Sequence, residues 1–188
     1  MTAKNKDKAF SRRLVSEYFD WVETFILALG FVLLTFTFVV RFVIVDGSSM
    51  MHTLKDGDSL IISNMNYEPK TGDIIVVTAP HYREDYPLVK RVIATEGQTV
   101  NINFDTWQVY VDGELLDEDY VNFVPGESME DYGNAGAYPI TVEDGCVFVM
   151  GDNRNGSIDS RSSRIGQLSE KNIMGKVIFK FRILPEER

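Results

Sequence analysis

A long uncharged apolar segment near the amino terminus constrains this chain more than any other feature. Residues 24–40 carry no charge, and all of them are apolar except for one glycine and three threonines. Trp21 and Val22 extend the segment to roughly the 20 residues that a helix needs to cross the hydrocarbon core of a bilayer. Arg41, which follows it, can extend its guanidinium toward water. The pattern predicts a single transmembrane anchor helix over residues 21–45.

Three other interpretations of this segment fit less well. A buried core helix rarely runs this long without a polar face. A cleavable secretory signal has an apolar core of about 7–15 residues that ends at a site with small residues, and residues 41–46 offer no such site. An interfacial helix would carry a charged stripe, which the sequence lacks. The pattern therefore favours an uncleaved anchor.

The charges on either side of the segment predict its orientation. Five lysines and arginines fall within the first 20 residues, and basic residues beside a span favour the cytoplasmic side. We therefore expect a cytoplasmic segment over residues 1–20 and an extracytoplasmic domain over residues 46–188. The chain is then a single-pass protein of the plasma membrane.

Composition excludes several classes of function. The formal net charge of −9 argues against a protein that binds the phosphate backbone of nucleic acid. The single cysteine, Cys146, rules out an intramolecular disulfide and any zinc or iron–sulfur site built from several cysteines.

After residue 45 the pattern becomes strand-like, with short β-branched runs between turn dipeptides. Asp112-Gly113 between two such runs predicts a two-residue hairpin. Residues 97–145, which include an acidic, glycine-containing loop at 125–138, predict a small β insertion. The fold class that we expect is mainly β: the anchor helix, then an all-β catalytic domain of the sandwich or barrel kind. The expected strands are 59–63, 73–77, 89–93, 108–111, 114–116, 146–150 and 176–181.

The segment just after the apolar stretch contains two adjacent serines, Ser48 and Ser49. On its own it reads as a plain linker, and it departs from the serine elbow of α/β-hydrolases because Met51 stands where that motif has glycine. The chain has only two histidines, His52 and His81, and His52 is too close to Ser49 in sequence to act readily as its base. A hydrolytic serine here would need a different base.

Lys90 is the candidate for that base. On a strand, Leu88, Lys90 and Val92 share one face, and apolar neighbours remove water from the amine and so lower its pKa. A base that works near neutrality requires a fall from about 10.4 to about 7–8. The alternative is a lysine on an outer face that only solubilises its strand.

Residues 151–161 are rich in turn formers and opposite charges. Asp159 and Arg161 are close enough in sequence to form an ion pair, and the segment by itself reads as a rigid structural loop.

Taken together and in this order, these segments resemble the type I signal peptidase family, the membrane-anchored serine proteases that remove signal peptides from exported proteins. The resemblance covers nearly the whole chain, and the single span with a short outer domain resembles the Gram-positive branch. Besides the anchor, it rests on four ordered boxes at residues 47–54, 71–76, 89–94 and 150–161.

The resemblance implies Ser49 as the nucleophile and Lys90 as the general base, a Ser-Lys variant of activated-serine catalysis. Ser157 matches the position that holds the lysine amine, and Asp159 and Arg161 match an ion pair that braces the site. The other implied residues are two structural neighbours of the site, Asp152 and Asn153, and four apolar pocket positions, Val45, Met50, Leu54 and Val89.

Two departures from the family pattern stand out. Some members have a serine hydroxyl two residues before the nucleophile as a second oxyanion donor, where this chain has Gly47, so that a glycine N–H or water is left for that role. The family usually has proline three residues after the nucleophile, where this chain has His52. We predict that His52 is a tolerated variant and not a catalytic base.

The implied partners are signal peptides of secretory preproteins, the lipid bilayer and, as a further candidate, the secretion translocon. The resemblance implies cleavage after small residues, with no metal and no cofactor. One alternative function is a catalytically silent, membrane-tethered protein that binds exported chains on the same scaffold. Another is self-cleavage, as in repressors that use a Ser-Lys pair, but the chain has no DNA-binding region.

Overall fold

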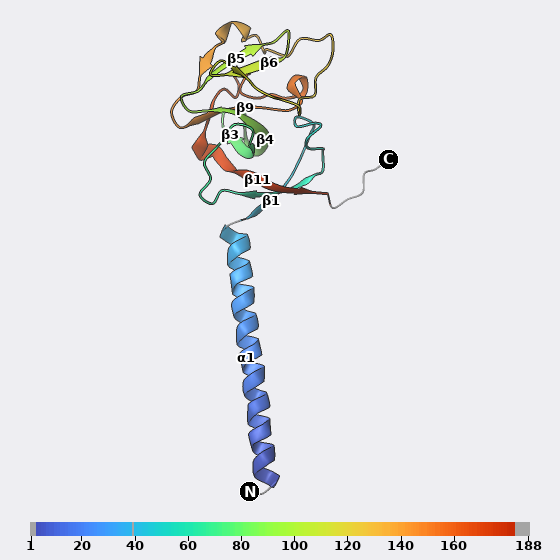
Figure 1. The fold of residues 1–188 in the computed structure, drawn as a ribbon, viewed down its shortest axis with the longest axis vertical. Coiled ribbons are helices and arrows are strands. Elements are labelled where there is room, and N and C mark those ends of the chain that lie inside the picture. Colours follow the sequence, from blue (N-terminus) through green and yellow to red (C-terminus); the bar gives the residue numbers. More distant parts are fainter. Residues whose placement is uncertain (1–2, 39, 183–188) are drawn as a thin grey trace. The chain divides into compact units, whose positions relative to one another are not determined.

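The computed structural model describes residues 3–38 and 40–182, and it describes their side chains except those of residues 3–14, 35–38 and 83–85. The chain divides into two compact units, Met1–Val40 and Arg41–Arg188. The first unit is one helix, α1, over Ala3–Phe38 (Figure 1).

The prediction of a helix over residues 21–45 is wrong at its carboxyl end. Helix α1 ends at Phe38, and Arg41–Ile44 form strand β1, which pairs antiparallel with β2, Ser59–Ser63. Aromatic and β-branched residues suit a half-buried pleated surface, and the backbone groups of β1 find partners in β2 rather than in a further helical turn.

The structure also bears on the predicted membrane crossing. Across the residues that it describes, no helix combines the length and the apolar character that a bilayer crossing requires. The predicted span includes residue 39 and the side chains of residues 35–38, which lie outside the described part of the chain.

The mainly β fold predicted for the second unit is confirmed. A seven-stranded antiparallel sheet has the order β1-β2-β11-β3-β4-β9-β10, and residues 40–182 contain no α-helix. Besides β1 and β2, its strands are β3 Ile74–Ala79, β4 Arg83–Thr95, β9 Cys146–Met150, β10 Leu168–Ser169 and β11 Ile173–Phe181.

A second sheet of four antiparallel strands, β7-β6-β5-β8, falls within residues 97–145 (Figure 1). Its hairpin turns at Asp112 and Gly113, which have φ values of 53° and 85°. Positive φ at both central residues is the mark of the two-residue turn that the sequence predicts. The strands are β5 Thr99–Asn103, β6 Gln108–Val111, β7 Glu114–Leu115 and β8 Ile140–Thr141, and three 3₁₀ helices are η1 Ala135–Ala137, η2 Arg154–Gly156 and η3 Glu170–Asn172.

One buried cluster supports the segment that follows β1. Met50 and Leu54 are 1% and 2% exposed, and burying a side chain of this size stabilises a fold by about 1.5–3 kcal/mol. The segment at residues 47–54 is therefore anchored by its own buried side chains, those of Met50 and Leu54. The buried members of the cluster are Val45, Met50, Leu54, Leu60, Ile62 and Val76.

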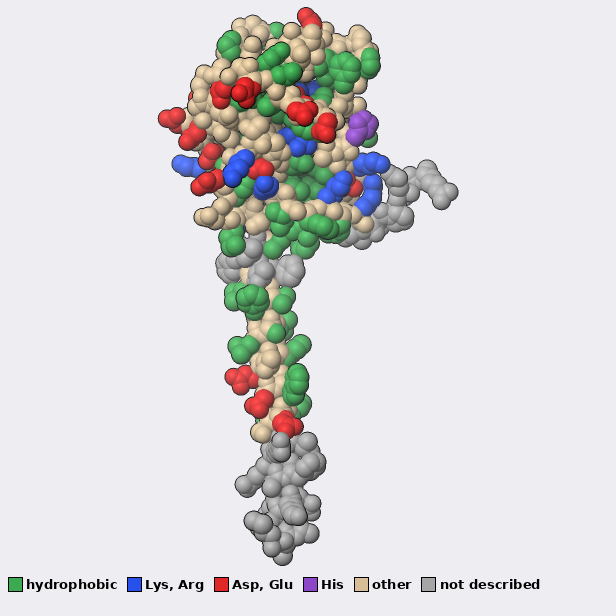
Figure 2. Space-filling view, viewed as in Figure 1, with side chains coloured by type: hydrophobic (Ala, Val, Ile, Leu, Met, Phe, Trp, Pro, Cys, Tyr) green, Lys and Arg blue, Asp and Glu red, His purple; other side chains and the backbone are tan. Residues whose placement is uncertain are grey.

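Apolar side chains also gather at the surface, along the edge of the domain where β1 and β11 lie (Figure 2). The ring of Phe181 packs against those of Phe42 and Phe179, with centroids 6.5 and 6.2 Å away. We call this surface the apolar edge, and it comprises Phe42, Ile44, Ile178, Phe179 and Phe181.

Candidate active site

Three segments meet at the candidate site: the turn at residues 47–54, strand β4, and the loop at residues 151–161 that follows β9. Strands β4 and β9 are paired, with Arg91 opposite Met150. The loop therefore begins beside the strand that carries Lys90. The turn after β1 is tied to the same loop, because the Asn153 N–H donates to the Ser49 carbonyl over 3.0 Å.

Ser49 and Lys90 are in direct contact. Lys90 Nζ and Ser49 Oγ are 2.8 Å apart, within the reach that a base needs to take a proton from a nucleophile. Lys90 is 3% exposed and Ser49 is half-buried. Lys90 is thus a buried residue rather than a solubilising one on an outer face.

The surroundings of Lys90 favour its neutral form. Burial lowers the pKa of the Lys90 amine from 10.5 to about 8, although the nearby carboxylate of Asp159 acts in the opposite direction. A lysine in water is almost fully protonated at pH 7, whereas one with a pKa near 8 supplies a useful fraction of neutral amine.

A buried ion pair lies beside Ser49 and Lys90, the two residues that we call the dyad. Arg161 Nε donates to Asp159 Oδ1 over 2.8 Å, and neither side chain is exposed. Burial alone would raise the pKa of the Asp159 carboxyl, but the Arg161 guanidinium holds that pKa below its ordinary value. The Asp159 carboxylate also accepts the Gly151 N–H over 2.9 Å, and so fixes the start of the loop.

The Ser157 hydroxyl donates to Asp159 Oδ2 over 2.9 Å. Among the described residues, no hydrogen bond joins it to the Lys90 amine, the contact that the resemblance implies. Ser157 is nonetheless close to the turn, because a methyl group on Gly151 would overlap both the Ser157 hydroxyl and the Ser49 carbonyl. Only glycine fits at position 151.

A second ion pair holds the other side of the loop. Arg91 donates to both carboxylate oxygens of Asp152, over 2.8 and 2.6 Å, and the Thr53 hydroxyl donates to Asp152 as well. Asp152 therefore joins the residue after Lys90 to the turn that carries Ser49. The Asn153 side chain adds a bond of 3.1 Å to the Ser48 carbonyl.

The backbone around Ser49 narrows the choice of oxyanion donors. The Gly47 N–H already donates to Asp56 Oδ1 over 2.8 Å, so it is not available as a second donor. Within the described part of the chain, the Ser49 N–H donates to no acceptor.

A cleft of about 160 Å³ opens beside Ser49 and Lys90. Of the four predicted pocket residues, Val45, Met50 and Val89 line it. Leu54 is not part of the lining, although it shares its buried cluster with Val45 and Met50. The full lining is Val43, Ile44, Val45, Asp46, Ser49, Met50, Tyr86, Pro87, Leu88, Val89 and Lys90.

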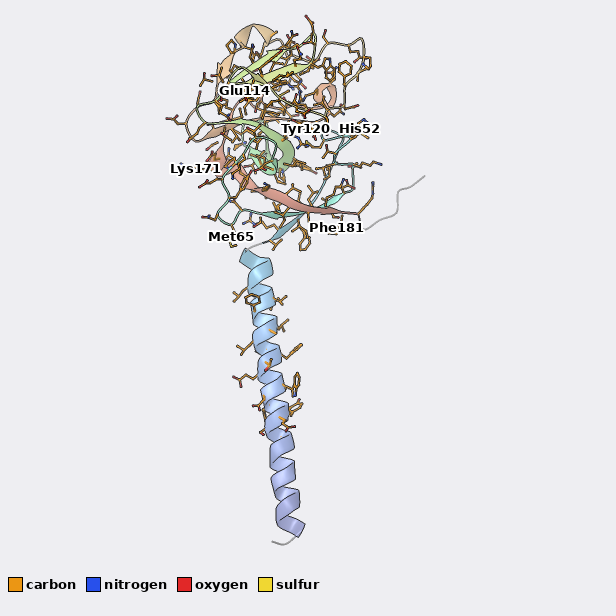
Figure 3. The ribbon with its side chains drawn as sticks, viewed as in Figure 1. His52, Met65, Glu114, Tyr120, Lys171 and Phe181 are labelled. Atoms are coloured by element: carbon orange, nitrogen blue, oxygen red, sulfur yellow. The ribbon has the colours of Figure 1, made fainter. Side chains whose placement is uncertain are left out.

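Neither histidine reaches the dyad. His52 is exposed at the surface (Figure 3) and its Nε2 lies 2.9 Å from Asn122 Oδ1, while His81 is exposed in the segment between β3 and β4. No group of three or more histidine, cysteine, aspartate or glutamate side chains that could hold a metal occurs in the part of the chain that the structure describes.

The sequence interpretation missed several residues that build this site. Arg91 and Thr53 both bind Asp152, and Tyr120 and Asn122 approach from a segment that carries no recognised motif. Nothing in the local sequence of residues 118–122 marks these side chains as part of the site.

Comparisons with known proteins agree on one family. The family model described as "Signal peptidase, peptidase S26" matches residues 18–182. Signal peptidase I of Bacillus amyloliquefaciens is 34% identical over 90% of this chain and 88% of its own length. A probable signal peptidase I-1 of Synechocystis sp. is 38% identical over 82% of this chain and 78% of its own. The crystal structure of a signal peptidase I from Enterococcus faecalis is 30% identical and covers 59% of this chain and 97% of its own, with a TM-score of 0.47.

Proposed function

Because this chain belongs to the signal peptidase family, peptidase S26, we propose that it hydrolyses the peptide bond between a signal peptide and an exported preprotein. Family membership confirms the resemblance that the sequence predicts. The observation that carries the proposed chemistry is the 2.8 Å contact between the buried Lys90 amine and the Ser49 hydroxyl.

The proposed reaction begins with the neutral Lys90 amine, which accepts the Ser49 hydroxyl proton while Oγ attacks the scissile carbonyl carbon. The Ser49 N–H stabilises the negative charge that develops on the carbonyl oxygen. The Lys90 ammonium then protonates the leaving nitrogen, the carbon–nitrogen bond breaks, and an ester on Ser49 remains. The amine next deprotonates a water molecule, which hydrolyses the ester and restores both side chains.

The remaining polar residues act on geometry in this scheme. Asp159, Arg161 and Ser157 fix the loop beside the amine, while Asp152 and Asn153 fix the turn that carries Ser49. Precise placement matters because a misplacement of about 1 Å can cost on the order of 100-fold in rate.

The cleft supports the choice of substrate. With about 160 Å³ and a mostly apolar lining, it suits small side chains next to the scissile bond. The substrate would bind extended, as a strand added beside the site.

We place the reaction at a lipid bilayer. Residues 24–40 carry no charge, and apolar side chains on the described part of α1, such as Trp21 and Phe25 at 76% and 67%, are exposed. The apolar edge adds a second surface that suits lipid, and Ile44 belongs both to this edge and to the cleft lining. A signal peptide, whose core is apolar, would meet the dyad at that boundary.

Cleavage of a purified preprotein by the full chain in lipid vesicles tests this function. We expect a single cut after a small residue, and Ser49→Ala should lower the rate at least about 1,000-fold, as loss of a nucleophile does. Ser163→Ala, the same change at an exposed serine, should leave the rate unchanged. Binding without cleavage by the unmodified chain would contradict the proposal and favour the silent binding protein, which the comparisons do not support.

A further inference from the structure

Residues 118–122 form a segment that we call the strap. The side chains of Glu118, Tyr120 and Asn122 in this segment contact residues of the active site. The strap follows β7 of the second sheet, whereas Lys90 lies on β4 of the first sheet and Ser49 lies in the turn between β1 and β2 of that sheet. The segment turns at Asp119 and Tyr120, where the Val121 N–H donates to the Glu118 carbonyl over 3.1 Å, and Glu118, Tyr120 and Asn122 each contact a different part of the site. Tyr120 lies on the same side of the domain as His52 in Figure 3.

Tyr120 contacts the neighbour of the proposed base. The Arg91 guanidinium carbon lies 3.7 Å from the centroid of the Tyr120 ring, a geometry in which the ring face attracts the cation. Arg91 directly follows Lys90 in β4 and holds both oxygens of Asp152. The ring therefore covers the guanidinium that connects β4 to the loop.

Asn122 reaches the other half of the dyad through one intermediate. Its amide nitrogen donates to Asn153 Oδ1 over 3.3 Å, and its backbone N–H donates to the Asp152 carbonyl over 3.1 Å. The Asn153 N–H in turn donates to the Ser49 carbonyl over 3.0 Å. Only Asn153 separates the strap from the serine.

Glu118 fixes the start of the strap. Its carboxylate pairs with Arg154 over 2.5 Å, and these side chains are 8% and 0% exposed. The Tyr120 hydroxyl donates to the same carboxylate over 2.9 Å. The loop, the ring and the strap are thus joined at one buried carboxylate.

We propose that the strap keeps the Ser49 turn and the Lys90 strand in register, with Tyr120 and Asn122 as positioning residues that touch neither reacting atom. This inference deepens the proposed function and rests on it. The strap reaches Lys90 through Arg91 and reaches Ser49 through Asn153, so one segment positions both residues of the dyad. Through it, the second sheet controls the geometry of a site that it does not line.

A positioning role and a purely structural role of the strap predict different changes in local order and in kinetics when the strap is weakened. A brace between two sheets would stabilise the whole domain, and its loss would loosen all parts together. A positioning strap, when weakened, should loosen only residues 48–54 and 151–157 and should lower kcat while KM stays constant.

Four variants and one rescue variant test the strap in the full chain. The changes are Tyr120→Leu and Asn122→Ala, with Tyr110→Leu and Asn101→Ala as matched controls in strands of the second sheet, and Tyr120→Phe, which keeps the ring. Amide hydrogen exchange at pH 7, read on peptides that cover the two loosened segments, reports their order. Preprotein cleavage gives kcat and KM.

We expect both strap variants to exchange faster in those two segments only, with kcat about tenfold lower and KM within about twofold, the loss that a misplacement below about 1 Å entails. Tyr120→Phe should restore kcat, and the two controls should match the unmodified chain in both measurements.

The proposal would be overturned if amide hydrogen exchange and kcat were both unchanged in Tyr120→Leu and in Asn122→Ala. Faster exchange over the whole domain, or equal losses in the controls, would also overturn it in favour of a brace. Failure of the unmodified chain to cleave any preprotein would contradict the proposed function instead, while the exchange pattern would still decide whether the strap orders the turn.

Discussion

Lys90 and Ser49 are separated by 41 residues in the chain, yet 2.8 Å separates Nζ of one from Oγ of the other. The turn is anchored by the buried side chains of Met50 and Leu54, and Lys90 is held within the central part of the main sheet. The Lys90 amine is thus shielded from water by the turn and by the sheet. Its burial costs stability and at the same time supplies the neutral form that the proposed reaction needs.

Replacement of Lys90 by methionine should stabilise the protein. An unfolded chain keeps the ordinary lysine pKa of 10.5, whereas burial lowers the pKa in the native state to about 8. This difference corresponds to about 3 kcal/mol at 1.36 kcal/mol for each pKa unit. At pH 7 we therefore expect Lys90→Met to raise the free energy of unfolding by up to about 3 kcal/mol and to abolish cleavage.

The same variant should change how stability depends on pH. Between pH 8 and 10.5 the Lys90 amine binds more protons in the unfolded state than in the native state, so its contribution to the free energy of unfolding rises with pH across this window. Urea unfolding at pH 7 and pH 10 measures the rise, which Lys90→Met should remove and Lys70→Met, at an exposed lysine, should retain. A Lys90→Met protein less stable than the unmodified chain at pH 7 would refute the burial argument.

Arg161→Met should destabilise the domain strongly. It leaves the Asp159 carboxylate buried without its partner, which typically costs about 3–5 kcal/mol. Lys176→Met is the matched control, because the Lys176 ammonium pairs with Asp73 but its side chain is 40% exposed. We expect a loss of about 1 kcal/mol or less for that pair. Equal losses in urea unfolding would show that the buried pair has no special role.

His52→Ala should remain active. The imidazole is exposed, and its contact is with Asn122 Oδ1 rather than with Ser49. Loss of one exposed hydrogen bond costs on the order of 1 kcal/mol, so we expect at most about a fivefold decrease in kcat/KM for preprotein cleavage. A folded His52→Ala protein without activity would show that the imidazole takes part in the reaction.

The parts of the fold that the sequence predicts are those that local pattern determines. Residues 59–63 and 146–150 are short runs with β-branched residues, which favour strands, and both are strands with those bounds. Local pattern does not predict the end of α1, because Phe42, Val43 and Ile44 are as apolar as the helix before them. Only the pairing of β1 with β2 decides their conformation.

The same distinction holds for the residues of the site, because local pattern predicts some of their positions and not others. The apolar neighbours of Lys90 on its strand make it a candidate for burial but leave an outer face as the alternative, and the separation of two residues permits an ion pair between Asp159 and Arg161 without requiring it; the structure decides both. Tyr120 gives no such local signal, since its partner Arg91 lies on a distant strand. Leu54 is apolar whether it lines a cleft or a core, so its place beneath the turn required the structure.

The most direct test of the account is the pH dependence of kcat/KM for preprotein cleavage. If the neutral Lys90 amine is the base, kcat/KM should fall about tenfold for each pH unit below the pKa and level off above it. We expect one ionisation with a midpoint near pH 8, where burial places the pKa of Lys90. A midpoint near 10.5, the ordinary lysine value, or a rate that does not depend on pH between 6 and 9 would contradict it.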